Sequence, residues 1–261
     1  MGLAYPVLVG GPLALVGLFI RLRMEETPAF KELQREEQIE GVPVLEAIRD
    51  HLKNIVLVFA IASLSGLGAY TIGTYFVTYL TVTIGLDQST AILANALAFG
   101  VSVPLVPLVG LFGDRIGRKP LLFIGTVGFI VLSVPGYALA GSGGLGTAIL
   151  GQLLVVLPWS FVVSAVVVTQ VEIFPTRVRY SGASIGYNAA YMIFGGTAPL
   201  VATFLVSQTG SNIAPAVYLV VVAAIVFFAV LALPETRGLS LLREGEGRPE
   251  SVLGTTGARP S

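Results

Sequence analysis

Charged residues and glycines are concentrated between residues 110 and 120, and the sequence on both sides is largely apolar. The segment reads GLFGDRIGRKP, and its charged members are Asp114, Arg115, Arg118 and Lys119. Acids and bases this close together can form charge-assisted hydrogen bonds, which open and close without any change in covalent bonding. Glycines that allow tight backbone turns are expected to fold the segment into a short loop, and they are Gly110, Gly113 and Gly117. The chemistry that this segment predicts is reversible ion pairing.

A second set of residues is polar or aromatic and lies within long apolar stretches. Its members are Thr71, Tyr75, Asn95, Trp159, Asn188 and Tyr191. Because unsatisfied polar groups are costly in lipid, such side chains are expected to face a bundle interior or a water-filled path. Two alternatives stay open. The tyrosines could form a belt at the membrane surface, and the ring N–H of Trp159 could bind either a solute or another helix.

The composition is that of a membrane protein. Hydrophobic residues make up 54% of the chain and charged residues only 11%, and the mean hydropathy is +0.86. The net charge is zero, so the sequence gives no electrostatic reason to expect a nucleic-acid partner. The chain has no cysteine and one histidine, and no nucleophile–base pair stands out, so we expect neither a metal or other cofactor nor catalytic residues.

Seven apolar runs are long enough to cross a bilayer, which takes about 20 helical residues. They are expected at about residues 3–20, 54–84, 91–112, 121–140, 145–169, 181–207 and 213–233. All fifteen Lys and Arg residues lie outside the core of these runs, in alternate connections and in the tail. Under the positive-inside rule these basic connections and the C-terminus are cytoplasmic.

The runs divide the chain into four parts, all of them helical or irregular. Residues 1–20 are expected to form a transmembrane helix, and 21–53 a cytoplasmic loop of mixed charge. Residues 54–233 would form a bundle of six helices, and 234–261 a cytoplasmic tail that is largely disordered because it is rich in Gly, Glu, Arg and Thr. The predicted fold class is an all-α polytopic membrane bundle with about seven spans.

Three segments resemble signatures of the major facilitator superfamily of transporters. They are GLFGDRIGRKP, the stretch EIFPTRVRYSG at residues 172–182, and PETRG at residues 234–238. The segments EETPAF and TYFVTYLTVTIGL are most similar to the metabolite:proton symporter branch, which includes bacterial proline/betaine, α-ketoglutarate, citrate and shikimate carriers. The resemblance covers residues 3 to about 241, in the order of helices 6 to 12 of a twelve-helix facilitator. Helices 1 to 5 have no counterpart in this sequence.

This resemblance implies a proton-coupled secondary transporter of the bacterial plasma membrane, truncated to its C-terminal half. The expected partners are the lipid bilayer, a small polar metabolite such as an organic acid, amino acid derivative or osmolyte, protons, and a separate N-terminal half. Facilitator folds place the solute between two halves that rock against each other. A non-transporting fragment that needs a separate N-terminal half is one alternative, and a sugar-porter-like facilitator is the other. An enzyme is the least favoured class.

Within this family the charged residues are expected to form a cytoplasmic gate. Asp114 would cap the N-terminal end of a helix across the interface between the halves, where the helix dipole is positive. Glu172 would pair with Arg115 or Arg118. Glu235 would pair with a base of the second signature, either Arg177 or Arg179. The carboxylate nearest to a span is Glu172, so a proton relay is expected to lie mainly in the other half.

Overall fold

The computed structural model describes residues 43–236, together with Val16 and Phe19, and all regular structure within them is helical. Six helices in this part of the chain are long and apolar enough to cross a membrane. The predicted all-α membrane bundle is therefore confirmed. The expected span at 3–20, most of the central loop and the tail from residue 237 onward lie outside the described residues. The chain divides into two compact units after residue 41, and residues 43–236 belong to the second.

The six spans run Leu52–Thr83, Gln88–Ile116, Arg118–Ala140, Leu145–Glu172, Arg179–Thr209 and Ala214–Ala232. Short π-helical turns, denoted η, interrupt the first and fifth spans. In chain order the elements are α3 (Pro43–Asp50), α4 (Leu52–Tyr70), η1 (Thr71–Tyr75), α5 (Phe76–Thr78), η2 (Tyr79–Thr83), α6 (Gln88–Gly100), α7 (Ser102–Ile116), α8 (Arg118–Ala140), α9 (Leu145–Glu172), α10 (Arg179–Ala190), η3 (Tyr191–Gly195), α11 (Gly196–Thr209) and α12 (Ala214–Ala232).

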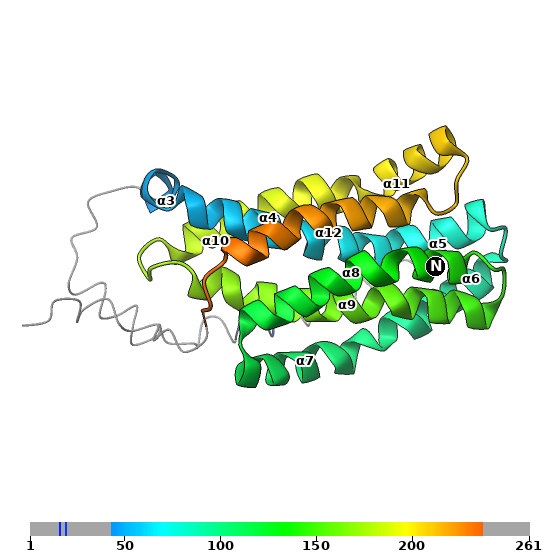
Figure 1. The fold of residues 1–261 in the computed structure, drawn as a ribbon, viewed down its shortest axis with the longest axis horizontal. Helices are drawn as coiled ribbons and strands as arrows, with labels where there is room; N and C mark the ends of the chain where they lie inside the picture. Colours follow the sequence, from blue (N-terminus) through cyan, green and yellow to red (C-terminus); the bar gives the residue numbers. More distant parts are fainter. Residues whose placement is uncertain (1–15, 17–18, 20–42, 237–261) are drawn as a thin grey trace, which may run out of the picture. The chain divides into compact units, whose positions relative to one another are not determined.

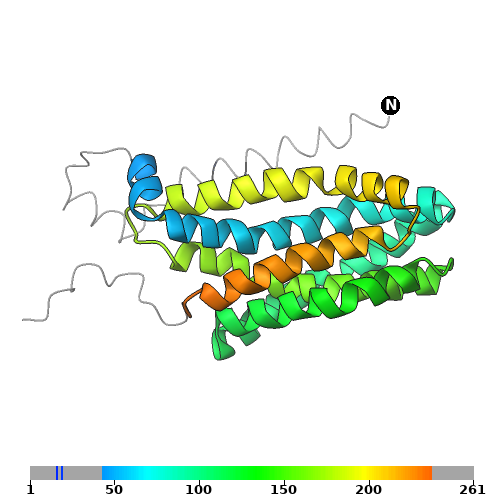
Figure 2. The same ribbon diagram turned by 45° about the horizontal axis from the view of Figure 1, so that its top comes forward.

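The spans lie side by side, and their connections gather at two ends (Figures 1 and 2). One end holds α3, the α7–α8 junction, the segment between α9 and α10, and the end of α12. Every Lys and Arg among residues 43–236 lies at or next to these connections. The opposite end holds the short connections that follow η2, α8 and α11. The alternation of Lys and Arg seen in the sequence thus separates two ends of the bundle in space, which we call the charged end and the opposite end.

Helix α4 occupies a central position in the bundle. It contacts α9, α10, η3 and α12, and every residue from Ile61 to Gly68 is buried. Helices α8 and α9 pack so closely that backbone meets backbone, since a Cβ atom on Gly136 would lie 2.8 Å from the carbonyl oxygen of Gly151. Small residues allow this kind of contact between membrane helices, where van der Waals packing replaces the hydrophobic effect. The bundle therefore presents α4 to several neighbouring helices at once.

Candidate functional site

The α7–α8 junction is one residue long. Helix α7 continues to Ile116 and α8 begins at Arg118, so Gly117 alone separates them. Its backbone has φ +107°, a conformation that L side chains rarely adopt. The expected short loop over 110–120 is therefore wrong, because the helices extend through the charged residues and only Gly117 turns the chain.

Gly110 and Gly113 are helical residues of α7 and do not form turns, contrary to expectation. Gly113 faces α8 closely, since a Cβ atom there would lie 2.7 Å from a methyl carbon of Leu121, which would have to move. Around Gly110 no atom outside its chain neighbours and the surrounding backbone of its own helix lies within 4 Å of where a Cβ atom would be. The two glycines thus differ: one admits a neighbouring helix, and the other leaves the surface of α7 open.

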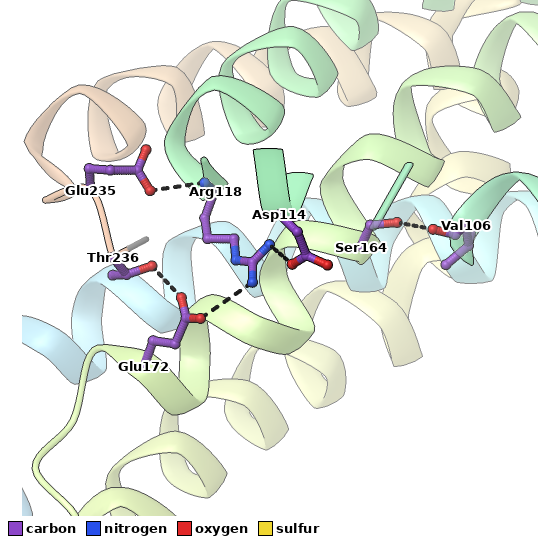
Figure 3. Close-up of polar contacts among 7 residues, drawn as sticks. All are labelled: Val106, Asp114, Arg118, Ser164, Glu172, Glu235 and Thr236. Atoms are coloured by element: carbon purple, nitrogen blue, oxygen red, sulfur yellow. Dashed lines mark hydrogen bonds and ion pairs between the residues drawn. The ribbon is translucent and has the colours of Figure 1, made fainter. Parts of the chain in front are cut away.

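Arg118 is the centre of an ion network at the charged end (Figure 3). Its guanidinium donates to Asp114 Oδ1 over 2.7 Å and to Glu172 Oε1 over 3.5 Å, which links α7, α8 and α9. The side chains of Arg118 and Glu172 are only 13% and 16% exposed, whereas that of Asp114 is 60% exposed. The structure therefore contains the predicted contact between Glu172 and the basic cluster, with Arg118 as the partner. Arg115 is exposed next to this network.

The segment after α12 also joins this network. Thr236 is fully buried, and its hydroxyl donates to Glu172 Oε2 over 2.6 Å. The carboxylate of Glu235 accepts hydrogen bonds from the backbone N–H groups of Arg118 and Lys119, at 2.9 and 3.2 Å. Lys119 in turn donates from Nζ to the carbonyl of Leu231 in α12, over 2.9 Å. We call the contacts among Asp114, Arg118, Glu172, Glu235 and Thr236 the charged lock.

Glu235 occupies a different position from the one expected. Its carboxylate lies at the N-terminus of α8, where unpaired N–H groups and the helix dipole favour a negative charge. The expected cap of a helix N-terminus is thus formed by Glu235 in this structure, while Asp114 pairs with Arg118 one turn away. The carboxylate can approach because residue 117 is glycine, since a Cβ atom there would lie 2.5 Å from Glu235 Oε2.

The two arginines of the second signature bind other groups at the same end. Arg177 forms an ion pair with Glu46 of α3 over 3.2 Å, which ties α3 to the segment between α9 and α10. Arg179 donates from Nε to the carbonyl of Phe174 over 3.3 Å. Glu235 was expected to pair with one of these bases, and in this structure its carboxylate caps α8.

Asn95 links three spans inside the bundle. Its Nδ2 atom donates to the carbonyl of Ile72 in η1 over 2.6 Å and to Oε1 of Gln152 in α9 over 2.9 Å. Gln152 is fully buried and donates to the carbonyl of Ala148. A π-helical turn carries one extra residue, so a backbone carbonyl is released from the regular helical pattern. The amide of Asn95 meets a carbonyl of this turn, and it lies half-buried in the interior as the sequence indicated.

Trp159 and Tyr191 both bind Ser65 of α4. The ring N–H of Trp159 donates to the Ser65 carbonyl over 3.0 Å, so its partner is another helix. The hydroxyl of Tyr191 lies 3.0 Å from the Ser65 hydroxyl, and the Tyr191 ring stacks on that of Tyr187 at 4.3 Å. Trp159 is buried and Tyr191 is half-buried.

The remaining predicted cavity residues are divided between interior and surface. Thr71 and Tyr75 lie in η1, and both are buried, at 4% and 2% exposure. Asn188 is exposed on α10 and donates to the carbonyl of Ser184 in its own helix. The structure thus brings Asn95, Trp159 and Tyr191 into contacts between spans, and it places Asn188 on an outer face.

Several residues of the charged lock and of the interior contacts had no distinctive pattern in the sequence. Ser65 and Gln152 looked like ordinary small and polar residues, and Thr236 was visible only as part of the PETRG signature. Another is Ser164 of α9, whose hydroxyl donates to the carbonyl of Val106 in α7 over 2.8 Å (Figure 3). This contact holds α7, the helix that carries Asp114, against α9. A partner far along the chain cannot be read from local spacing.

Comparisons with known proteins are consistent with this architecture. A family model described as "Sugar (and other) transporter" matches residues 5–244. The chain is 30% identical to the ectoine/proline transporter ProP of Corynebacterium glutamicum, across 92% of this chain and 50% of that protein. It is 32% identical to a Staphylococcus aureus protein named for proline/betaine transport, across 92% and 52% of the two chains.

A third relative is the glycine betaine/proline/ectoine/pipecolic acid transporter OusA of Dickeya dadantii. The identity is 31%, across 90% of this chain and 48% of the relative. The chain therefore spans about half the length of the curated relatives that it matches.

Proposed function

The chain belongs to the family of sugar and other transporters within the major facilitator superfamily, and from this membership we propose that it forms the C-terminal half of a secondary active transporter. The transported solute is a small zwitterionic osmolyte or amino acid derivative, carried together with protons by alternating access. The compounds in the relatives' names support this solute class, since proline, betaine, ectoine and pipecolic acid each join a carboxylate to a positively charged nitrogen group.

The observation that carries this proposal is the charged lock. It joins α7, α8, α9 and the segment after α12 through ion pairs and hydrogen bonds, in addition to the packing between these helices. A partly exposed contact such as Arg118–Asp114 is worth about 1 kcal/mol or less. Solute binding can therefore supply enough free energy to shift an equilibrium between locked and open states. We propose that the lock sets the shape of the surface that this half presents to the other at a cytoplasmic gate, so the charged end would face the cytoplasm.

The solute site is proposed to lie along the interior polar and aromatic residues. Thr71, Tyr75, Asn95, Trp159 and Tyr191 come from four spans, and Asn188 stands on the adjoining surface of α10. Aromatic faces attract a positively charged nitrogen group, and amide or hydroxyl donors suit a carboxylate. The other half of the transporter would complete the site. On this half, Asp114 and Glu172 are the acids at the charged ends of spans, and Glu172, the less exposed of the two, is proposed for a role in proton coupling.

Uptake measurements test this function. The chain is produced in a bacterial strain without its own proline and betaine uptake, both alone and together with the N-terminal half of the Corynebacterium glutamicum relative. Radiolabelled proline and glycine betaine are the probes, with glucose as the control solute. We expect uptake of the zwitterions in the paired arm, faster with an inward proton gradient and abolished by a protonophore. Uptake of glucose in place of both zwitterions would contradict the proposed solute class.

A second candidate is that this bundle moves no solute by itself and contributes to transport only when a separate N-terminal half binds it. The match to about half the length of the relatives favours this candidate. Uptake in the paired arm alone supports this candidate. Uptake by the chain in the absence of any added half would contradict it.

A further inference from the structure

Ser65 holds side chains from two other spans at one point of α4. Its carbonyl accepts from the ring N–H of Trp159 on α9 over 3.0 Å. Its hydroxyl pairs with that of Tyr191 in η3, also over 3.0 Å. Ser65 is fully buried, and Tyr191 is half-buried. A single residue of the first span thus binds two of the aromatic residues proposed to face the solute.

The residues after Ser65 provide the space for both rings. A Cβ atom on Gly68 would lie 2.5 Å from Cδ1 of Trp159, closer than real Cβ atoms come to a neighbour. A Cβ atom on Gly66 would lie 3.2 Å from the ring of Tyr191. We call residues 65–68, with the sequence SGLG, the aromatic seat. The hydrogen bonds of Ser65 and the missing side chains of the two glycines act on the same pair of rings.

Two further aromatic rings extend this arrangement. Phe99 of α6 lies 5.7 Å from Trp159 between ring centroids, at an interplanar angle of 42°. Tyr187 of α10 stacks on Tyr191 at 4.3 Å. Trp159 is buried, whereas the other three rings of this group, those of Phe99, Tyr187 and Tyr191, are half-buried. Rings from α6, α9, α10 and η3 are therefore positioned relative to α4.

We propose that Ser65 is a positioning residue of the solute site, which holds Trp159 and Tyr191 in a fixed mutual arrangement for solute binding. The inference rests on the proposed function, because it assigns the solute to these rings. Ser65 itself is buried beneath them and acts through them. Loss of its hydroxyl leaves the Tyr191 hydroxyl without this partner, so the ring is held less firmly in its stacked position. The solute then has to order that ring on binding, which weakens its affinity.

Fluorescence provides a direct test because Trp159 is the only tryptophan in the chain. The purified chain is placed in lipid nanodiscs together with the N-terminal half of the Corynebacterium glutamicum relative, in which every tryptophan is replaced by phenylalanine. This complex is titrated with proline and with glycine betaine, and the emission of Trp159 is recorded. We expect a saturable change for the unaltered chain. Ser65→Ala and Tyr191→Phe should each weaken the apparent affinity about five- to tenfold, the effect of one typical hydrogen bond. The double variant should be no weaker than either single variant, because both remove the same contact.

Ser63→Ala is the matched control. Ser63 is equally buried on the same helix, but its hydroxyl donates to the carbonyl of Phe59 one turn back and contacts no other span through this bond. The apparent affinity of the Ser63→Ala variant for proline and glycine betaine should be unchanged. Equal effects of Ser63→Ala and Ser65→Ala would overturn the proposal, and so would additive losses in the double variant, which would mean that the hydroxyls of Ser65 and Tyr191 act separately.

A measurement without solute separates this inference from the proposed function. Gly68→Ala places a methyl group against Trp159, so its emission should shift to longer wavelength and its quenching by acrylamide should increase. Unchanged emission and quenching would overturn the aromatic seat. The emission of Gly68→Ala could change as expected while neither solute alters the emission of the unaltered chain. In that case the assignment of these solutes to this site fails, and the aromatic seat itself is supported.

Discussion

At the scale of single residues, Gly117 meets two requirements that no other amino acid meets together. It turns the chain between two helices with a positive φ, and it leaves room for the Glu235 carboxylate at the N-terminus of α8. Any side chain would strain the backbone and collide with that carboxylate. The cap, and with it the attachment of the segment after α12, therefore depends on a missing side chain.

Gly117→Ala should destabilise the bundle by more than about 1 kcal/mol, because alanine is incompatible with the native backbone angle and also displaces Glu235. The measurement is the free energy of unfolding in detergent, by denaturant titration. Gly110→Ala is the matched control, since no atom of another helix lies within 4 Å of where its Cβ atom would be and alanine is favoured in a helix interior by up to about 1 kcal/mol. Equal stability of the two variants would contradict the assigned role of Gly117.

At the scale of elements, the π-helical turns are the features that most affect the proposed site. Thr71 and Tyr75 lie in η1, and Tyr191 lies in η3, so three of the six predicted cavity residues fall in such turns. A π turn shifts the phase of the helix by one residue, and residues after it face a different direction from the one that a regular α-helix gives. Asn95 binds the carbonyl of Ile72 in η1 and thereby ties this local distortion to the second and fourth spans.

Asn95→Ala should destabilise the bundle by about 1–3 kcal/mol, because it leaves Gln152 and the Ile72 carbonyl with one partner fewer in a buried region. It should also weaken binding of the solute, since η1 holds Tyr75. Asn188→Ala removes the same side chain from an exposed site with a bond inside its own helix, and it should change stability by less than about 0.5 kcal/mol. Denaturant titration measures both, and similar losses for the two variants would refute the cross-span role of Asn95.

The N-terminus of α6, at the opposite end, provides a test of pH dependence. Asp87 caps this helix, and hydrogen bonds from the Ser89 side chain and from backbone N–H groups hold the pKa of its carboxyl below its ordinary value of 3.8. The ionised form is favoured in the folded state, so its contribution to stability is complete above pH 3.8 and is lost as the pH falls through the lowered pKa.

Asp87→Ala should therefore lower the midpoint of thermal unfolding by a few degrees at neutral pH, and the difference from the unaltered chain should shrink in acid below that range. Asp87→Asn keeps an acceptor for the cap but cannot titrate, so its own difference should stay smaller at neutral pH. A gap between Asp87→Ala and the unaltered chain that is constant with pH would argue against this cap.

At the scale of the whole molecule, the charged lock is expected to favour one state of the transport cycle. Asp114→Asn removes the negative charge that pairs with Arg118, so the open state of the charged end should become more populated. Thr169→Cys provides a reporter, because Thr169 is fully buried one turn before Glu172 and the chain has no other cysteine. Labelling by a charged maleimide should be faster in the Asp114→Asn background.

Arg115→Gln is the control for this labelling experiment, since Arg115 is the exposed neighbour of Asp114. Labelling of residue 169 should proceed at its original rate in that variant. An Asp114→Asn variant with unaltered labelling would remove the basis for the gate.

The bundle itself could be predicted because apolar length and the distribution of Lys and Arg are local properties of the sequence. The contact of Glu172 with Arg118 was also predictable, since both residues belong to recognisable signatures. Three other features could not be predicted from the sequence. The cap by Glu235 depends on contacts across 117 residues, the π turns depend on where neighbouring helices bind a released carbonyl, and the place of Trp159 depends on Gly68. Each of these arises from tertiary packing, and sequence periodicity does not encode it.

The cap on α8 also has a consequence for the order in which the chain is made. Ribosomes synthesise α8 first, and Glu235 follows Arg118 by 117 residues. Until the last span has been inserted, the N-terminal N–H groups of α8 must therefore bind water or lipid headgroups. The charged end can assume its final arrangement only when translation has passed Thr236, and we expect a nascent chain arrested after α12 to expose the α7–α8 junction to proteases that the finished chain resists.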